Sequence, residues 1–179
     1  MDVKHRIELV QLLKELGLPL VAAEVGCAEM LFSRDLISAG LDKLYLIDNW
    51  GEIIGQKGDG GFNQDWHDKN FKEGMERVAP YMSKIRVLKG MSTDMAKEIP
   101  DGELSLCYLD ADHSYMAVMK DLFSFFPKVV HGGIIASHDA LNEDYGVKKA
   151  FEDFCRGKYE IKIIPENSIY DASAYFIKK

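Results

Sequence analysis

The chain has 179 residues, of which 47% are hydrophobic and 28% are charged, a composition typical of a globular domain rather than a disordered segment. It carries 29 acidic and 22 basic side chains, and the formal net charge of −7 with no long basic run argues against nucleic acid or an anionic membrane as a partner. Three widely spaced cysteines match neither a disulfide framework nor a zinc motif, and no apolar run reaches the roughly 18 residues of a membrane span.

The elements are predicted from the periodicity of the apolar residues in chain order. Residues 1–18 hold an N-terminal helix, because apolar side chains recur at helical spacing until Gly17. Short, continuous apolar runs predict buried strands, and longer amphipathic stretches predict helices between them. The strands are expected at 20–26, 43–48, 84–89, 104–110, 133–139, 159–164 and 173–178, and the further helices at 29–39, 65–80, 115–126 and 144–156.

This alternation of strands and helices predicts one α/β domain over residues 1–179 with a largely parallel, doubly wound sheet. The last two strands are joined by residues 165–172 only, which is too short for a crossover helix. Parallel neighbours need a connection of a dozen or more residues, so these two strands are expected to pair antiparallel. The apolar stripe of the helix at 115–126 is expected to pack into the core.

The segment 51–67 is a candidate lid. Five of the chain's 15 glycines fall within residues 51–61, which favours a loop over regular structure. The segment directly follows the second strand, so it is placed to close over a ligand at the end of the sheet and to exclude water.

Polar side chains follow five of the predicted strands, and in an open α/β sheet ligands bind outside the carboxyl ends of the strands. Gly26 opens the first strand-to-helix turn, where a ligand can approach the backbone. Asp48 ends the second strand, where a carboxylate can accept both hydroxyls of a ribose. The dinucleotide motif GxGxxG is absent, and Glu24 and Glu29 would repel a pyrophosphate. The pattern therefore favours a nucleoside cofactor without phosphates, preferably one with a positive charge.

These residues resemble the class I S-adenosylmethionine-dependent methyltransferases. The segment 24–29 (EVGCAE) is similar to the opening of the family's first motif, 48–50 (DNW) to its ribose motif, and 90–92 (GMS) to the stretch beside adenine. The segments 109–115 (LDADHSY) and 132–139 (GGIIASHD) resemble a narrower subfamily with (I/L)DG(D/N)HSYE and GGxxxxHD segments, which includes macrocin and other sugar O-methyltransferases. Met30 stands where the family has its second glycine.

The resemblance, which extends from about residue 20 to 179, implies a Rossmann-like three-layer sandwich. Its seven-stranded sheet is expected in the order 3-2-1-4-5-7-6 with strand 7 antiparallel. It also implies S-adenosyl-L-methionine as the cofactor and a set of residues that bind it. The positions that match the cofactor motifs are Glu24, Gly26, Cys27, Ala28, Asp48, Asn49, Trp50, Gly90, Met91, Ser92 and Asp110.

Methyl transfer to a hydroxyl requires alignment of the nucleophile, exclusion of water and removal of a proton. His113 and His138 are candidate bases because the ordinary histidine pKa of about 6.5 lies near working pH. Asp110 and Asp139 complete the catalytic candidates and are also candidate Mg²⁺ ligands, since Mg²⁺ prefers oxygen donors. Without a metal, Asp110 would orient a histidine or contact the cofactor.

The sequence thus predicts a cytoplasmic S-adenosylmethionine-dependent methyltransferase that acts on a small hydroxylated molecule. Two alternatives stay open: a non-catalytic nucleoside-binding module, and a nucleotide-dependent oxidoreductase, which the missing GxGxxG disfavours. Because 179 residues leave little room for a substrate cap, we hypothesise that a second copy of the chain completes the substrate pocket as a homodimer.

Overall fold

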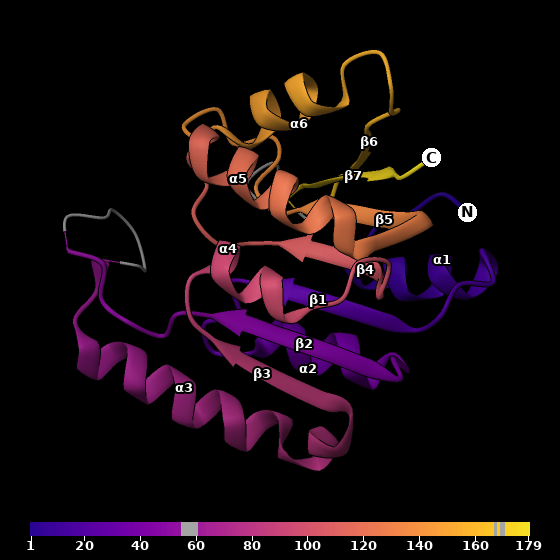
Figure 1. The fold of residues 1–179 in the computed structure, drawn as a ribbon. Helices are drawn as coiled ribbons and strands as arrows, with labels where there is room; N and C mark the ends of the chain where they lie inside the picture. The colour runs from indigo at the N-terminus through magenta and orange to yellow at the C-terminus, as the bar shows by residue number, and fades with distance from the viewer. Residues whose placement is uncertain (55–60, 167, 169–170) are drawn as a thin grey trace.

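Figure 1 shows the fold in a computed structural model, which describes residues 1–54, 61–166, 168 and 171–179. Seven strands form one sheet in the order β3-β2-β1-β4-β5-β7-β6. The first five strands are parallel, whereas β7 is antiparallel to both β5 and β6, which confirms the predicted topology. The strands are β1 (Val21–Val25), β2 (Lys43–Asp48), β3 (Ile85–Lys89), β4 (Leu104–Leu109), β5 (Val129–Ser137), β6 (Lys162–Ile164) and β7 (Ser173–Ile177).

Helices cover both faces of the sheet and give the three layers that the sequence predicted (Figure 1). The side chains of α1, α2 and α3 pack on one face and those of α4, α5 and α6 on the other, in two separate apolar clusters. The helices are α1 (Leu9–Glu15), α2 (Leu31–Ser38), α3 (Gln64–Val78), α4 (Ser92–Met95), α5 (Tyr115–Phe125) and α6 (Val147–Cys155), with 3-10 turns at Arg6–Glu8, Ala79–Lys84, Ala96–Glu98 and Phe126–Lys128. No helix in the described ranges is long and apolar enough to cross a membrane.

Several elements differ from the sequence prediction. The N-terminal helix predicted over residues 1–18 is shorter, because it consists of a 3-10 turn at Arg6–Glu8 and α1 at Leu9–Glu15. β5 begins at Val129 and continues through Gly132 and Gly133, where the register with β4 shifts. A glycine pair is typical of a turn, but here a Cβ at Gly133 would lie 2.6 Å from the Val129 side chain, so the irregular strand needs glycine. β6 is only three residues long. α4 has four residues, too few for a recognisable period, and was not predicted.

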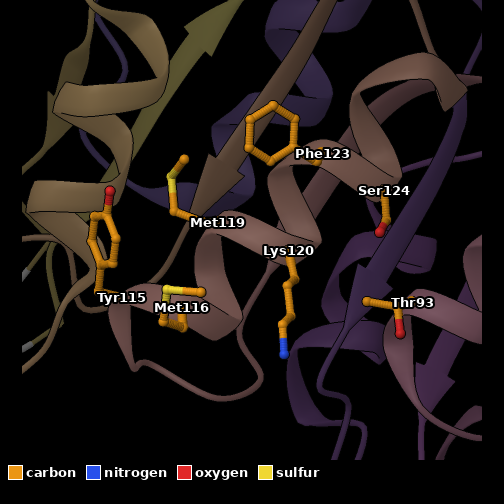
Figure 2. A pocket seen from close by; sticks show the side chains of 7 residues that line it. All are labelled: Thr93, Tyr115, Met116, Met119, Lys120, Phe123 and Ser124. Atoms are coloured by element: carbon orange, nitrogen blue, oxygen red, sulfur yellow. The ribbon is translucent and has the colours of Figure 1, made fainter.

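The apolar stripe of α5 was only partly predicted correctly. Val118, Leu122 and Phe125 are buried as expected, but Met116 and Phe123 are 62% and 65% exposed. The helix has two apolar sides, and only one of them faces the sheet. The outer side lines a groove of about 400 Å³ (Figure 2), formed by Thr93, Tyr115, Met116, Met119, Lys120, Phe123 and Ser124.

Candidate active site

The turn between β1 and α2 (residues 26–30, called the β1–α2 turn below) packs directly against the end of β4. Gly26 has φ +89°, and a Cβ built there would lie 2.2 Å from the backbone oxygen of Asp110. The Asp110 amide in turn donates to the Val25 carbonyl at 2.7 Å. Only glycine fits this close approach of two strand ends, which lie where the strand order reverses and α/β folds bind their ligands.

Several non-glycine residues at this edge adopt the left-handed conformation. They are Ala28 (φ 40°), Met30 (φ 57°), Trp50 (φ 39°) and Asp139 (φ 54°). Each such residue lowers the stability of the fold by on the order of 1–3 kcal/mol, and strained residues of this kind cluster at functional sites. Met30 thus holds a backbone conformation that a glycine would adopt without strain.

Asp48 ties the β1–α2 turn to the end of β2. Its Oδ2 accepts hydrogen bonds from the amides of Cys27 and Ala28, both at 2.9 Å, and its Oδ1 accepts one from Trp50 at 2.8 Å. A carboxylate offers about four acceptor sites, and these bonds occupy three of them. One ribose hydroxyl can therefore bind directly, and a second needs one backbone bond to be exchanged.

The residues after Asp48 stabilise the same turn. Trp50 is buried, its indole Nε1 donates to the Ala28 carbonyl at 2.8 Å, and its ring lies 4.8 Å from that of Phe71. Asn49 accepts a hydrogen bond from the Gly51 amide at 3.2 Å. Gln64 donates to the Trp50 carbonyl at 3.1 Å, so the start of α3 is joined to the beginning of the candidate lid. Residues 55–60 of that lid lie outside the described residues.

Glu24 and Cys27 are buried beneath the turn rather than exposed at its surface. The Ser33 hydroxyl donates to the Glu24 carboxyl, and burial raises the pKa of Glu24 to about 8. The carboxyl is therefore mostly protonated at neutral pH. The Cys27 thiol donates to the Glu24 carbonyl at 3.3 Å, and burial raises its pKa well above the ordinary value, which makes this thiol unreactive.

The segment 90–92 connects β3 to α4, where Gly90 donates through its amide to the Asp48 carbonyl at 2.9 Å and Met91 is 52% exposed. The Ser92 hydroxyl donates to Asp121 of α5 at 2.5 Å. Burial raises the pKa of Asp121 to about 6. Asp121 was missed in the sequence, although a carboxylate within the apolar stripe of α5 was a signal for a buried polar contact.

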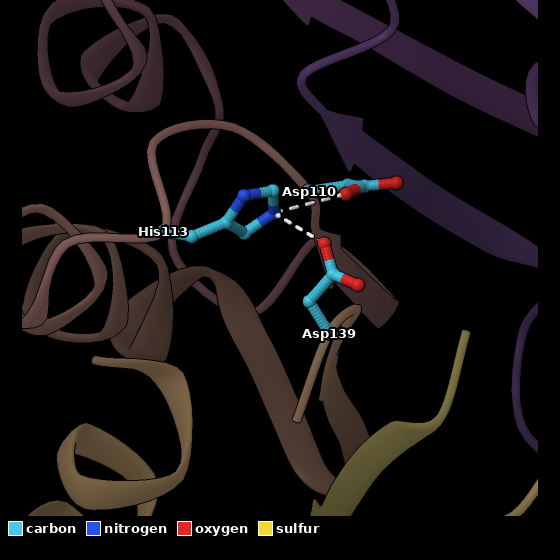
Figure 3. A group of neighbouring side chains, drawn as sticks. All are labelled: Asp110, His113 and Asp139. Carbon is cyan, nitrogen blue, oxygen red and sulfur yellow. Dashed lines mark hydrogen bonds and ion pairs between the residues drawn. The ribbon is translucent and has the colours of Figure 1, made fainter. Parts of the chain in front are cut away.

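Two aspartates and two histidines meet beyond the ends of β4 and β5. His113 Nε2 lies 3.3 Å from Asp110 Oδ1 and 3.6 Å from Asp139 Oδ2, as Figure 3 shows. His138 Nδ1 lies 3.5 and 3.4 Å from the same two oxygens. The structure thus brings all four catalytic candidates together.

The two histidines differ in their surroundings. The His113 ring stacks on Tyr145 at 4.8 Å and 23°. His138 is more buried, and no partner for its buried Nε2 is present in the described part of the chain. Burial opposes the charged form of His138, but the Asp139 and Asp110 carboxylates outweigh it and raise its pKa.

Donor atoms of Asp110, His113 and Asp139 lie within 4.8 Å of one another, and this group can therefore hold a metal ion. The carboxylate oxygens suit Mg²⁺, whereas the imidazole nitrogen is more typical of Zn²⁺ or another transition ion.

The comparisons agree with this architecture. Residues 24–140 match the methyltransferase domain family. A Staphylococcus aureus protein provisionally named a caffeoyl-CoA O-methyltransferase superposes with a TM-score of 0.69 at 15% identity, over 99% of this chain and 86% of that one. The O-methyltransferase NovP superposes with a TM-score of 0.68 at 19% identity, over 97% of this chain and 77% of that one. CalS11, a TDP-rhamnose 3'-O-methyltransferase, superposes with a TM-score of 0.64 at 15% identity, over 97% of this chain and 81% of that one.

No curated protein matches the sequence significantly. At these identities the solved structures establish the fold, while the family match covers most of the chain, including every strand from β2 to β5. The chain therefore belongs to the methyltransferase domain family and has the fold of the class I S-adenosylmethionine-dependent methyltransferases.

Proposed function

We propose that this methyltransferase acts on a hydroxyl oxygen of a small molecule, in the manner of the subfamily with DxDHSY and GGxxxxHD segments. The observation that carries the proposal is the group of Asp110, His113, His138 and Asp139, whose facing atoms lie 3.3–3.6 Å apart. Methyl transfer to oxygen requires a proton acceptor beside the nucleophile, and this group supplies two imidazoles held by two carboxylates. NovP and CalS11, which share the fold, are themselves O-methyltransferases.

The residues at the strand ends fit S-adenosylmethionine. Asp48 retains acceptor capacity for a ribose hydroxyl, the glycine at position 26 keeps the turn close to the end of β4, and the carboxylates of Asp110 and Asp139 suit a cationic group. The turn segments 26–28 and 90–92 are each hydrogen-bonded to Asp48. When bound, this cofactor supplies a methyl group activated by the adjacent sulfonium.

We assign the general base to His113, whose side chain is 21% exposed against 15% for His138. Nε2 of His113 faces the two carboxylates, so in the neutral ring it would carry the hydrogen that they accept. The opposite nitrogen, Nδ1, would accept the hydroxyl proton, and the charges of Asp110 and Asp139 would stabilise the imidazolium that forms. Tyr145 holds the ring in place by stacking. His138, which contacts the same two carboxylate oxygens, would keep them oriented.

A second candidate mechanism is metal-assisted transfer. Asp110, His113 and Asp139 would then hold a divalent ion, which lowers the pKa of a coordinated hydroxyl. In that case His113 serves as a ligand and His138 is the remaining base.

The test is a screen of hydroxylated metabolites for release of S-adenosylhomocysteine, with a chelator or with added Mg²⁺, Mn²⁺ or Zn²⁺. We expect His113→Ala to lower kcat about 10²- to 10⁴-fold while S-adenosylhomocysteine still binds, and the exposed His131→Ala to change neither quantity. Full activity of His113→Ala would refute the assignment of the base. Loss of activity in the chelator, restored by one ion, would favour the metal mechanism.

Calorimetry separates the remaining alternatives. Binding of S-adenosylhomocysteine but not of NAD supports a methyltransferase, and the reverse result would support an oxidoreductase. Cofactor binding without turnover of any acceptor would favour the non-catalytic module. The single domain over 1–179, the lid at 51–67 and the homodimer also stay predictions, and the solution mass tests the last of these.

A further inference from the structure

Arg6 enters the site from the N-terminal segment, which the sequence had not connected with it. The residue starts the 3-10 turn before α1, and its backbone amide donates to a carboxylate oxygen of Glu166. Nδ1 of His5 lies 3.4 Å from the other oxygen of the same carboxylate. Glu166, just beyond β6, thus anchors the turn that carries Arg6.

The Arg6 guanidinium lies over the ring of Phe32, which in turn contacts the ring of Tyr108 near the carboxyl end of β4. Its Cζ is 4.5 Å from the centre of the Phe32 ring, which is 4.7 Å from the ring of Tyr108. Tyr108 pairs with Glu24 across β1 and β4 and precedes Asp110 by two residues. The permanent positive charge of Arg6 is therefore beside the β1–α2 turn and the catalytic end of β4.

The guanidinium is held in place but not neutralised by an ion pair. Within the described ranges its side-chain partners are the Phe32 ring and the Tyr108 hydroxyl, and no carboxylate forms a salt bridge with it. Burial opposes its charge, but Tyr108, Asp110 and Glu166 outweigh this effect and raise the pKa of Arg6. A guanidinium has five N–H donors, which is more than the Tyr108 hydroxyl can engage.

Charge complementarity indicates which anion this is. The inference rests on the proposed function, because S-adenosylmethionine carries a sulfonium, an ammonium and one carboxylate. Asp48, Asp110 and Asp139 surround the site with negative charge that suits the two cations and repels the carboxylate. Arg6 supplies a charge of the opposite sign at the same edge. We propose that Arg6 binds the carboxylate of the cofactor's methionine moiety.

Two ligands that differ only in that carboxylate test the proposal: S-adenosylhomocysteine and its decarboxylated form. A charge-assisted hydrogen bond contributes about 1.5–3 kcal/mol, which corresponds to about 10- to 150-fold in affinity. In calorimetry, we expect Arg6→Ala to weaken the binding of S-adenosylhomocysteine by about that factor and to leave the affinity for the decarboxylated ligand nearly unchanged. Arg6→Lys should restore part of the difference, because it keeps the charge without the planar fork.

Two further variants serve as controls. Arg6→Gln keeps a polar side chain against Phe32 while it removes the charge. It should show the same selective loss of affinity for S-adenosylhomocysteine, so it tests the proposal even if Arg6→Ala folds poorly. Arg34→Ala removes an exposed arginine that pairs with its neighbour Asp35 at 2.7 Å, and both ligands should bind it as they bind the wild type.

The possible results separate the two levels of the argument. If wild type binds neither ligand, the proposed cofactor is wrong. If wild type binds both and Arg6→Gln weakens them equally, Arg6 has only a packing role and the inference is overturned. Unchanged affinity of Arg6→Gln for S-adenosylhomocysteine would also overturn it, because the carboxylate would then bind elsewhere.

Discussion

Met30 and Gly74 occupy one space between the β1–α2 turn and α3, and we expect their substitutions to be strongly coupled. Met30 is fully buried, and a Cβ at Gly74 would lie 2.9 Å from its Cγ and Sδ atoms. Glycine at position 74 of α3 therefore leaves room for the methionine side chain of the turn.

The structure gives the size of each effect. In wild type, Gly74→Ala gains about 1 kcal/mol of helix propensity but overpacks Met30 at a cost of about 1–3 kcal/mol, so it should destabilise by roughly 0–2 kcal/mol. Met30→Gly relieves about 1 kcal/mol of backbone strain and loses about 2–5 kcal/mol of buried side chain. In the Met30→Gly background, Gly74→Ala should instead stabilise by about 1 kcal/mol.

Urea unfolding of the two single variants, the double variant and wild type measures this coupling, which we expect to be about 1–3 kcal/mol. The backbone oxygen of Glu29, 3.2 Å from the added methyl, is the same in both backgrounds and cancels in the cycle. An equal effect of Gly74→Ala in both backgrounds would show that the two residues do not share this space, and that another feature sets the path of the turn.

Two further predictions concern the same edge of the sheet. Gly26→Ala should lower the free energy of unfolding by about 2–6 kcal/mol, because it adds backbone strain and a clash with the Asp110 backbone. Gly17→Ala, with φ +66° and open space around it, should lower it only by the strain, about 1–3 kcal/mol. Equal losses in urea unfolding would contradict the close approach at Gly26. The pKa of Glu24 is raised to about 8 in the folded chain, so its favourable contribution is complete below about pH 4.5 and is lost as the pH rises toward 8. The unfolding free energy of wild type relative to Glu24→Gln should therefore fall between pH 5 and 8, and a constant difference would show that Glu24 is ionised in the fold.

The sequence by itself located most of the elements, and the family resemblance added the order of the strands. Apolar periodicity depends on neighbours a few residues apart, so α2, β2 and β4 were located to within about two residues, and the short last connection required β7 to be antiparallel. Because parallel strands place their carboxyl ends at one edge, the grouping of Asp110, His113, His138 and Asp139 was also expected in outline.

Tertiary structure decided what each side chain does at that edge. Burial makes Glu24 a neutral partner of Ser33, the β1–α2 turn uses Met30 because α3 supplies Gly74, and the N-terminal turn places Arg6 over Phe32. These contacts join residues 9 to 44 positions apart along the chain. Their energies depend on distance and burial in the folded molecule, which no local period in the sequence encodes.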